Sequence, residues 1–154
     1  MRVMMVEDDQ FKARRLEQVL RQIDASVEID RANSVTSSTR LLEMKQAFDL
    51  VLLDMSLPTF DVGPRESGGR PQGFGGREVM RFMQNNEINL PVIVVTQFER
   101  FGEAGREVDL PTLAETLKTE FPELFRGIVY YDAASERWRE ELSTLLGRAN
   151  SAAR

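Results

Sequence analysis

Short apolar runs rich in β-branched residues alternate along the chain with longer amphipathic stretches. The runs at 3–6, 50–53 and 92–95 are almost wholly apolar, as expected for strands buried on both faces of a sheet. Residues 27–29 alternate apolar and polar side chains, which predicts a strand near an edge, and 128–131 predict the last strand. Helices are predicted over 10–23, 34–45, 77–84 and 110–124, the last of these kinked or ended at Pro122, and after Ser135. The pattern predicts an α/β domain with a doubly wound parallel sheet and helices on both faces.

Two stretches interrupt this alternation. Residues 61–76 hold six of the ten glycines and two prolines, which predicts a long inserted loop. Residues 97–126 form an enlarged segment, in which 97–108 is predicted as a loop and Pro111 suits the first turn of the following helix. From Gly147 onward, small residues predict a flexible tail. We therefore expect one domain over 1–146, with the 61–76 insertion, and a C-terminal tail over 147–154.

The composition excludes several kinds of chemistry. The 154 residues include neither Cys nor His, which excludes disulfides, thiolate catalysis, Ser-His-Asp triads and a phosphohistidine on this chain. The net charge of −5 argues against direct binding of nucleic acid. No apolar run approaches the ~18 residues that cross a bilayer, and the first residues do not form a signal peptide. A cytoplasmic protein without a membrane partner is therefore expected.

Functional side chains follow three of the predicted strands. Glu7 and Asp8 follow the first strand, Asp54 the third and Thr96 the fourth. Each alone has a plainer explanation, because acids and hydroxyls also cap turns and helices. In an open parallel sheet, however, ligands bind beyond the carboxyl ends of the strands where the strand order reverses. If the first and third strands are neighbours, the carboxylates converge and repel unless a cation such as Mg²⁺ lies between them.

Three segments carry a specific resemblance, namely VEDD at 6–9, LVLLDMSLP at 50–58 and LPVIVVT at 90–96. In order and in position at strand ends they resemble the signature segments of bacterial response-regulator receiver domains. The resemblance implies a single flavodoxin-like, five-stranded parallel sheet in the order 2-1-3-4-5. It also implies that Asp54 is the phosphoacceptor and Thr96 the switch hydroxyl. The implied ligands of Mg²⁺ are Glu7, Asp8, Asp54 and the backbone carbonyl of Ser56.

The chain departs from the family at its last strand. The family ends this strand with a Lys-Pro pair whose lysine contacts the phosphoryl group, whereas this chain places Tyr131 and Asp132 there. Ile128 replaces the usual aromatic switch residue. Phosphorylation is therefore expected to be slow, to be absent, or to depend on a substitute cation from one of the arginines near the same end of the sheet: Arg65, Arg70, Arg77 or Arg100.

The resemblance implies a stand-alone receiver in phosphorelay signal transduction. A sensor histidine kinase or phosphorelay protein would phosphorylate Asp54, and the modified domain would signal through contacts with a downstream protein or a second copy of itself. Such a domain is not an enzyme beyond its own phosphorylation and dephosphorylation. One alternative is a pseudo-receiver that docks or dimerises without phosphorylation, which the missing lysine favours. A second is a Mg²⁺-dependent phosphohydrolase or nuclease, although Ser56 stands where aspartyl phosphatases carry a second acid.

Overall fold

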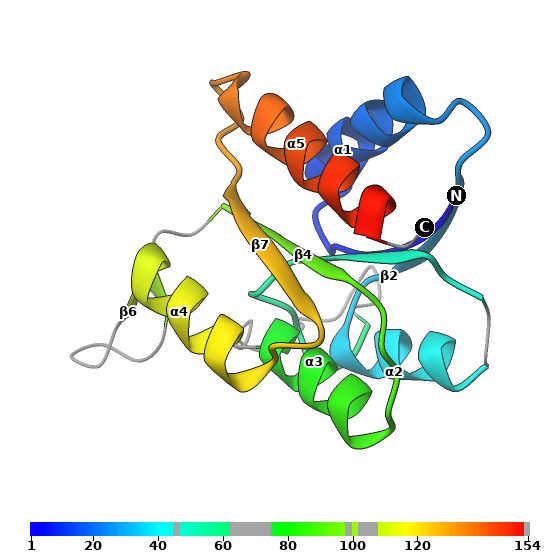
Figure 1. Cartoon of the computed structure of the whole chain (residues 1–154), viewed down its shortest axis with the longest axis vertical. Helices are drawn as coiled ribbons and strands as arrows, with labels where there is room; N and C mark the ends of the chain where they lie inside the picture. Colours follow the sequence, from blue (N-terminus) through cyan, green and yellow to red (C-terminus); the bar gives the residue numbers. More distant parts are fainter. Residues whose placement is uncertain (45–46, 62–74, 98–99, 102–107, 153–154) are drawn as a thin grey trace.

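A central sheet of five parallel strands organises the molecule (Figure 1). The computed structural model describes residues 1–44, 47–61, 75–97, 100–101 and 108–152. Its strand order, β2-β1-β3-β4-β7, confirms the predicted order 2-1-3-4-5 of the five sequential strands. The bounds of the strands are β1 Arg2–Val6, β2 Glu28–Ala32, β3 Leu50–Leu53, β4 Val92–Thr96 and β7 Phe125–Tyr130.

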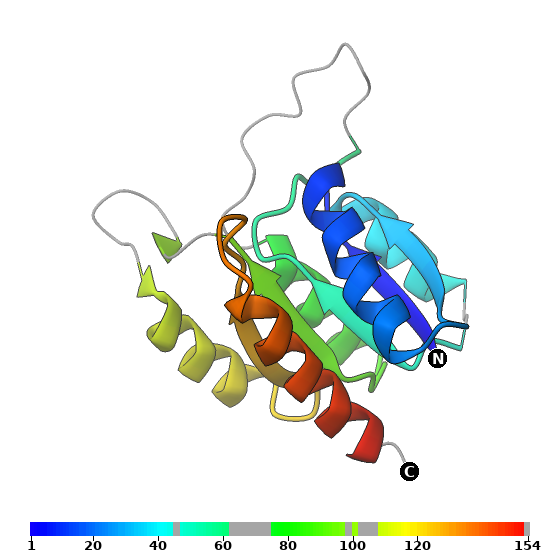
Figure 2. The same cartoon turned by 90° about the horizontal axis from the view of Figure 1, so that it is seen from above.

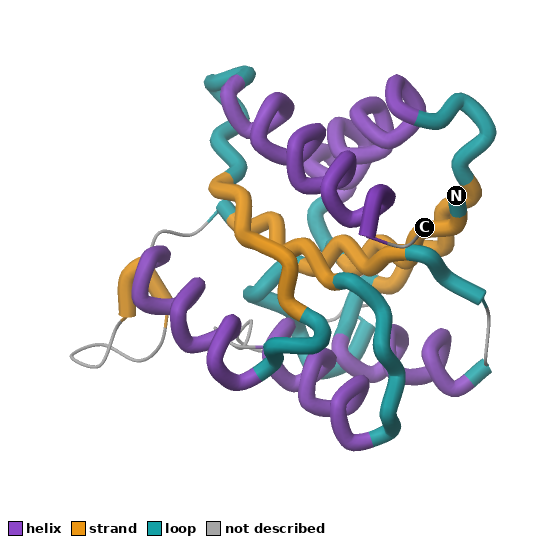
Figure 3. Tube along the Cα trace, in the orientation of Figure 1, coloured by secondary structure: helices purple, strands orange, loops and turns teal. Residues whose placement is uncertain are grey.

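Helices cover both faces of the sheet, as the tube in Figure 3 shows. Side chains that alternate along each strand build two separate cores: Met5 and Leu52 face α1 and α5, whereas Met4 and Val51 face α2, α3 and α4. Figure 2 shows α1 and α5 side by side on their face of the sheet. The helix bounds are α1 Gln10–Ile23, α2 Val35–Glu43, α3 Gly75–Asn85, α4 Leu110–Glu120 and α5 Arg137–Ala152.

Local capping explains where several helices begin and end. Asp9 caps α1 by accepting hydrogen bonds from the backbone of Phe11 and Lys12, and Ser34 caps α2 as predicted. Pro111 lies in the first turn of α4, also as predicted. That helix ends at Glu120 rather than at 124, because Pro122 lacks the N–H needed to continue it.

The structure corrects the two interrupted stretches. The predicted loop over 97–108 contains two short antiparallel strands, β5 (Arg100–Phe101) and β6 (Val108–Asp109). Helix α3 begins at Gly75, inside the predicted 61–76 loop. A Cβ at Gly76 would lie 2.5 Å from the carbonyl oxygen of Asp54. Gly76 therefore allows α3 to pack closely against the backbone of Asp54, and it is not a flexible loop residue. The rest of that loop, 62–74, lies outside the described residues.

The C-terminal helix also differs from the prediction. α5 continues through Gly147 to Ala152, so residues 147–152 of the predicted tail are helical. Trp138 and Leu142 are buried, and Leu146 is more deeply buried than Leu145. The domain limits at 1–146 remain a prediction. Among the described residues, no helix combines the length and the apolar character needed to span a bilayer.

Candidate functional site

The predicted acidic residues meet at the carboxyl edge of the sheet. Strands β1 and β3 are paired in parallel, with Val6 opposite Leu53, so the residues that follow them emerge together. One carboxylate oxygen from each of Glu7, Asp8 and Asp54 lies within 4.8 Å of the others. Glu7 and Asp54 are buried, whereas Asp8 is exposed. The pocket thus has two buried acids and one acid in contact with solvent.

Backbone hydrogen bonds beyond the strand ends fix these acids. The N–H of Asp54 donates to the carbonyl of Val6 at 3.0 Å, and the N–H of Glu7 donates to the carbonyl of Ala32 at 3.0 Å. The backbone N–H of Asp9 donates to Oε2 of Glu7 at 3.2 Å. Because Asp9 also caps α1, one short turn positions both the acid after β1 and the start of the helix.

Lys12, from the first turn of α1, enters this pocket, and the sequence analysis missed it. Its side chain is 1% exposed. Its Nζ forms an ion pair with Glu7, lies 3.4 Å from Oδ1 of Asp54, and donates a hydrogen bond to the carbonyl of Val95 at 2.7 Å. A signal existed: Lys12 lies one helical turn before Leu16, on the apolar side of an otherwise amphipathic helix.

Burial dominates the electrostatics of the two inner acids. Burial raises the pKa of Glu7 to about 8, with Lys12 opposing the rise and Asp54 adding to it. Burial also raises the pKa of Asp54, with Lys12 opposing the rise and Asp8 adding to it. Full ionisation of three acids beside one ammonium would leave the pocket at −2, and the raised pKa values of Glu7 and Asp54 show that this state is disfavoured without a further cation. The pocket is therefore short of positive charge.

The donor set fits a divalent, oxygen-preferring cation. Oε1 of Glu7 and Oδ1 of Asp54 are buried, and within the described part of the chain neither accepts a hydrogen bond of normal geometry, although both face the Lys12 ammonium. Mg²⁺ accepts carboxylate oxygens together with water. Glu7, Asp8 and Asp54 are the residues that would hold it. Ser56 lies two residues beyond Asp54, and its backbone N–H donates to the Asp54 carboxylate; its carbonyl as a metal ligand remains a prediction.

Thr96 and Tyr131 border the same pocket. Thr96 is fully buried at the end of β4, and its carbonyl accepts a hydrogen bond from the N–H of Tyr131 at 2.8 Å. The Tyr131 ring lies 5.8 Å from Nζ of Lys12, while its hydroxyl accepts a hydrogen bond from Arg15 at 3.2 Å. Asp132 is exposed and caps a turn by accepting from the N–H of Ala134, so its charge does not enter the pocket.

The predicted arginine substitute is not found among the described side chains. Arg77 instead forms an ion pair with Glu120, which joins α3 to α4. Arg65 and Arg70 lie outside the described residues, as does the side chain of Arg100. The cation that the structure places beside Asp54 is Lys12.

Known proteins resemble this chain in sequence and in fold. No family model matches it. A Detocs response regulatory protein, DtcB, from Enterobacter cloacae is 30% identical over 143 residues, which cover 92% of this chain and 95% of that protein. A CheY-like response regulator receiver domain protein from Methanospirillum hungatei superposes with a TM-score of 0.63 at 15% identity, over 97% of this chain and 94% of that one. A Francisella response regulator receiver domain gives 0.63 at 14% identity, over 99% and 98%.

The two solved structures share the fold of this chain. The similarity to the Enterobacter relative extends over nearly the whole chain and identifies its family. The five-stranded parallel sheet agrees with the CheY-like receiver fold. The chain belongs to the response-regulator receiver family.

Proposed function

We propose that this protein is a phosphoacceptor in a phosphorelay, that Asp54 receives the phosphoryl group with the aid of Mg²⁺, and that the signal leaves through protein–protein contacts. The observation that carries the proposal is the placement of the buried Asp54 carboxylate within 4.8 Å of those of Glu7 and Asp8. The name of the Enterobacter relative, a response regulatory protein, supports a signalling role. The phosphoryl donor would be a histidine kinase or a phosphorelay protein.

The proposed step is an in-line transfer to the Asp54 carboxylate. A carboxylate oxygen of Asp54 attacks phosphorus, the phosphorus–nitrogen bond of the donor phosphohistidine breaks, and its electron pair leaves with the imidazole. The product is an acyl phosphate. When bound, the divalent cation supplies neutralisation of the charge on the phosphoryl oxygens. Glu7 and Asp8 would hold the cation, and the Thr96 hydroxyl would hydrogen-bond the transferred group.

Nucleophilic attack requires Asp54 to be ionised. Burial raises the pKa of Asp54, which disfavours the ionised form, and Lys12 opposes this effect. The 3.4 Å separation between the Lys12 ammonium and Oδ1 of Asp54 therefore favours the reactive carboxylate. In the proposed step the phosphoryl group stays on the protein's own side chain, which is what a signalling role requires.

The test is the intact mass of the protein after incubation with Mg²⁺ and a small phosphodonor such as acetyl phosphate. We expect one phosphoryl adduct, which is absent in Asp54→Asn and retained in the control Asp132→Asn, whose side chain is exposed. If neither the small donor nor a histidine kinase gives an adduct, the phosphoacceptor role is wrong and the docking module is favoured. Sustained hydrolysis of a generic phosphoester that is lost in Asp54→Asn would favour a phosphohydrolase.

The docking alternative depended on the absence of a cation beside Asp54. Lys12 supplies a positive charge in the described structure, 3.4 Å from Oδ1 of Asp54. The main reason for preferring a phosphorylation-independent module is therefore weakened.

A further inference from the structure

We propose that Lys12 is a catalytic residue of this site and that its ammonium, which α1 delivers, contacts the phosphoryl group carried by Asp54. The inference rests on the proposed phosphorylation of Asp54. It assigns to an N-terminal helix the positive charge that is missing after the last strand, where the chain has Tyr131. Four features of the pocket support it: distance, charge balance, anchoring and the packing of Tyr131.

The first feature is distance. Nζ of Lys12 lies 3.4 Å from Oδ1 of Asp54, slightly longer than a hydrogen bond. A phosphoryl group on Asp54 places three more oxygens beyond the carboxylate, within reach of the same ammonium. The approach needs no large rearrangement, because Lys12 already faces the reacting carboxylate.

The second feature is the change of charge in the reaction. Before transfer, the ammonium faces two carboxyl groups, those of Glu7 and Asp54. Formation of the acyl phosphate removes the charge of the Asp54 carboxylate and brings a phosphoryl group of higher negative charge into its place. A buried ammonium contacts the most negatively charged group within its reach, because an unpaired ion in a low-dielectric pocket is costly. The stronger partner of Lys12 after transfer is therefore the phosphoryl group.

The third feature is anchoring. The hydrogen bond of 2.7 Å from Nζ to the carbonyl of Val95 ties the side chain to the end of β4, next to Thr96. At the other end, the backbone N–H of Lys12 donates to Asp9 at 3.1 Å. The side chain is 1% exposed, so it does not sample solvent. A charge held in place before the reaction stabilises a transition state more than a mobile one does.

The fourth feature is the packing of Tyr131 against Lys12. The Tyr131 ring centroid lies 5.8 Å from Nζ, and the ring also packs against Trp138, with ring centroids 4.9 Å apart. The aromatic ring fills the corner after β7 without adding a second ammonium to the buried pocket. Lys12 and Tyr131 are thus complementary, one supplying the charge and the other the volume.

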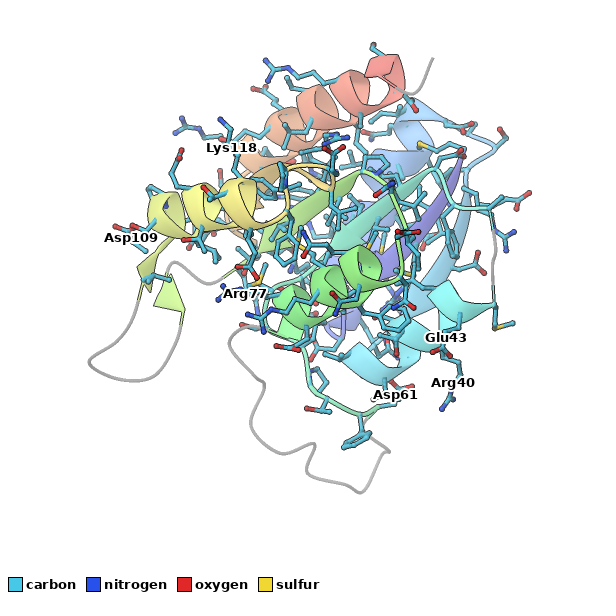
Figure 4. All side chains as sticks on the ribbon, turned by 60° about the horizontal axis from the view of Figure 1, so that its bottom comes forward. Arg40, Glu43, Asp61, Arg77, Asp109 and Lys118 are labelled. Carbon is cyan, nitrogen blue, oxygen red and sulfur yellow. The ribbon has the colours of Figure 1, made fainter. Side chains whose placement is uncertain are left out.

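The test compares rates of phosphorylation by a small phosphodonor with saturating Mg²⁺. We expect Lys12→Met to form the adduct about 10²-fold more slowly than the wild type, the loss typical of removing one group that stabilises transition-state charge. Lys118→Met is the matched control, since Lys118 is an exposed lysine on α4 (Figure 4). Circular dichroism establishes that both variants are folded. Equal rates for folded Lys12→Met and wild type overturn the inference.

A second measurement uses the unaltered chain, so it stands even where Lys12→Met does not fold. The sequence has only three lysines, which makes the side-chain ammonium resonances of ¹⁵N-lysine-labelled protein easy to separate. Addition of Mg²⁺ with trifluoroberyllate, a phosphoryl analogue, is expected to shift the Lys12 resonance and to leave that of Lys118 unchanged. A Lys12 resonance that Mg²⁺ alone shifts as much as Mg²⁺ with trifluoroberyllate overturns the inference.

The two proposals fail in distinguishable ways. If the wild-type chain forms no adduct with any donor, the phosphoacceptor role fails and the role of Lys12 fails with it. If the wild type forms the adduct and Lys12→Met forms it equally fast, Asp54 remains the phosphoacceptor and only the assignment of Lys12 is wrong.

Discussion

Glu7→Gln is expected to make the metal-free protein more stable, although it removes a carboxyl group that contacts the buried Lys12 ammonium. Burial holds the pKa of Glu7 at about 8, compared with an ordinary value of 4.5. Between these two values the folded state binds more protons than the unfolded state, so its stability falls as pH rises. Glutamine has nearly the same shape and no proton to release. The gain in stability of the variant over the wild type should therefore be negligible below pH 4.5 and largest near pH 8.

The expected size of the gain follows from the raised pKa. Each pKa unit corresponds to about 1.4 kcal/mol, so the carboxyl group of Glu7 costs the folded state up to about 3 kcal/mol at pH 7. That cost already includes the interaction with Lys12, which opposes the rise in pKa. For a domain of this size a gain of about 3 kcal/mol raises the melting temperature by about 6–12 °C.

The assay is thermal and urea unfolding in EDTA at several pH values from 4.5 to 8. Glu115→Gln is the control, because Glu115 is exposed on α4 and its change should stay within about 0.5 kcal/mol. Mg²⁺ should raise the melting temperature of the wild type more than that of Glu7→Gln. A Glu7→Gln protein that is less stable than wild type in EDTA at pH 7, or a gain that does not vary with pH, would refute the reasoning.

Three further changes test the arrangement around the pocket. In the Lys12→Met background, Tyr131→Lys should restore part of the phosphorylation rate, because position 131 borders the same pocket; an unchanged rate would show that a lysine there does not reach Asp54. Gly76→Ala should destabilise the fold by about 1–3 kcal/mol in urea unfolding, since its Cβ would lie 2.5 Å from the carbonyl oxygen of Asp54; a neutral effect would mean that α3 can shift freely. Gly127→Ala should lower the free energy of unfolding by about 1–3 kcal/mol, because Gly127 has a φ of +152° and the new Cβ would lie 2.8 Å from Leu145. The companion Leu145→Ala change should relieve the clash but not the backbone strain.

The fold could be predicted because its elements leave strong local signals. The fully apolar runs of β1, β3 and β4 and the capping residue Ser34 each identify an element without knowledge of its neighbours. The two-residue strands β5 and β6 are too short to show any periodicity, and they escaped prediction. From the sequence, Gly75 and Gly76 were predicted to lie in a loop. Glycine is needed at these helical positions because their backbone packs closely against Leu57 and Asp54, which are distant in sequence.

The site was predictable where topology alone brings residues together. Acids that follow adjacent parallel strands must meet at one edge, which is how Glu7 and Asp54 come together. The source of the positive charge was not predictable in this way, because it depends on which way a helical side chain points. Lys12 was overlooked within an amphipathic helix, and Arg77 was proposed although it pairs with Glu120.

The tilted contact between Tyr131 and Trp138 gives the protein an internal optical probe. Trp138 is the only tryptophan in the sequence and is 1% exposed. Its indole ring contacts Tyr131, whose ring centroid lies 5.8 Å from the Lys12 ammonium, and the Arg15 guanidinium lies 5.3 Å from the indole ring. Because indole emission responds to nearby charge, movement of Lys12 or Arg15 should change the fluorescence of an unlabelled chain. Occupation of the pocket could then be followed in real time without an added fluorophore.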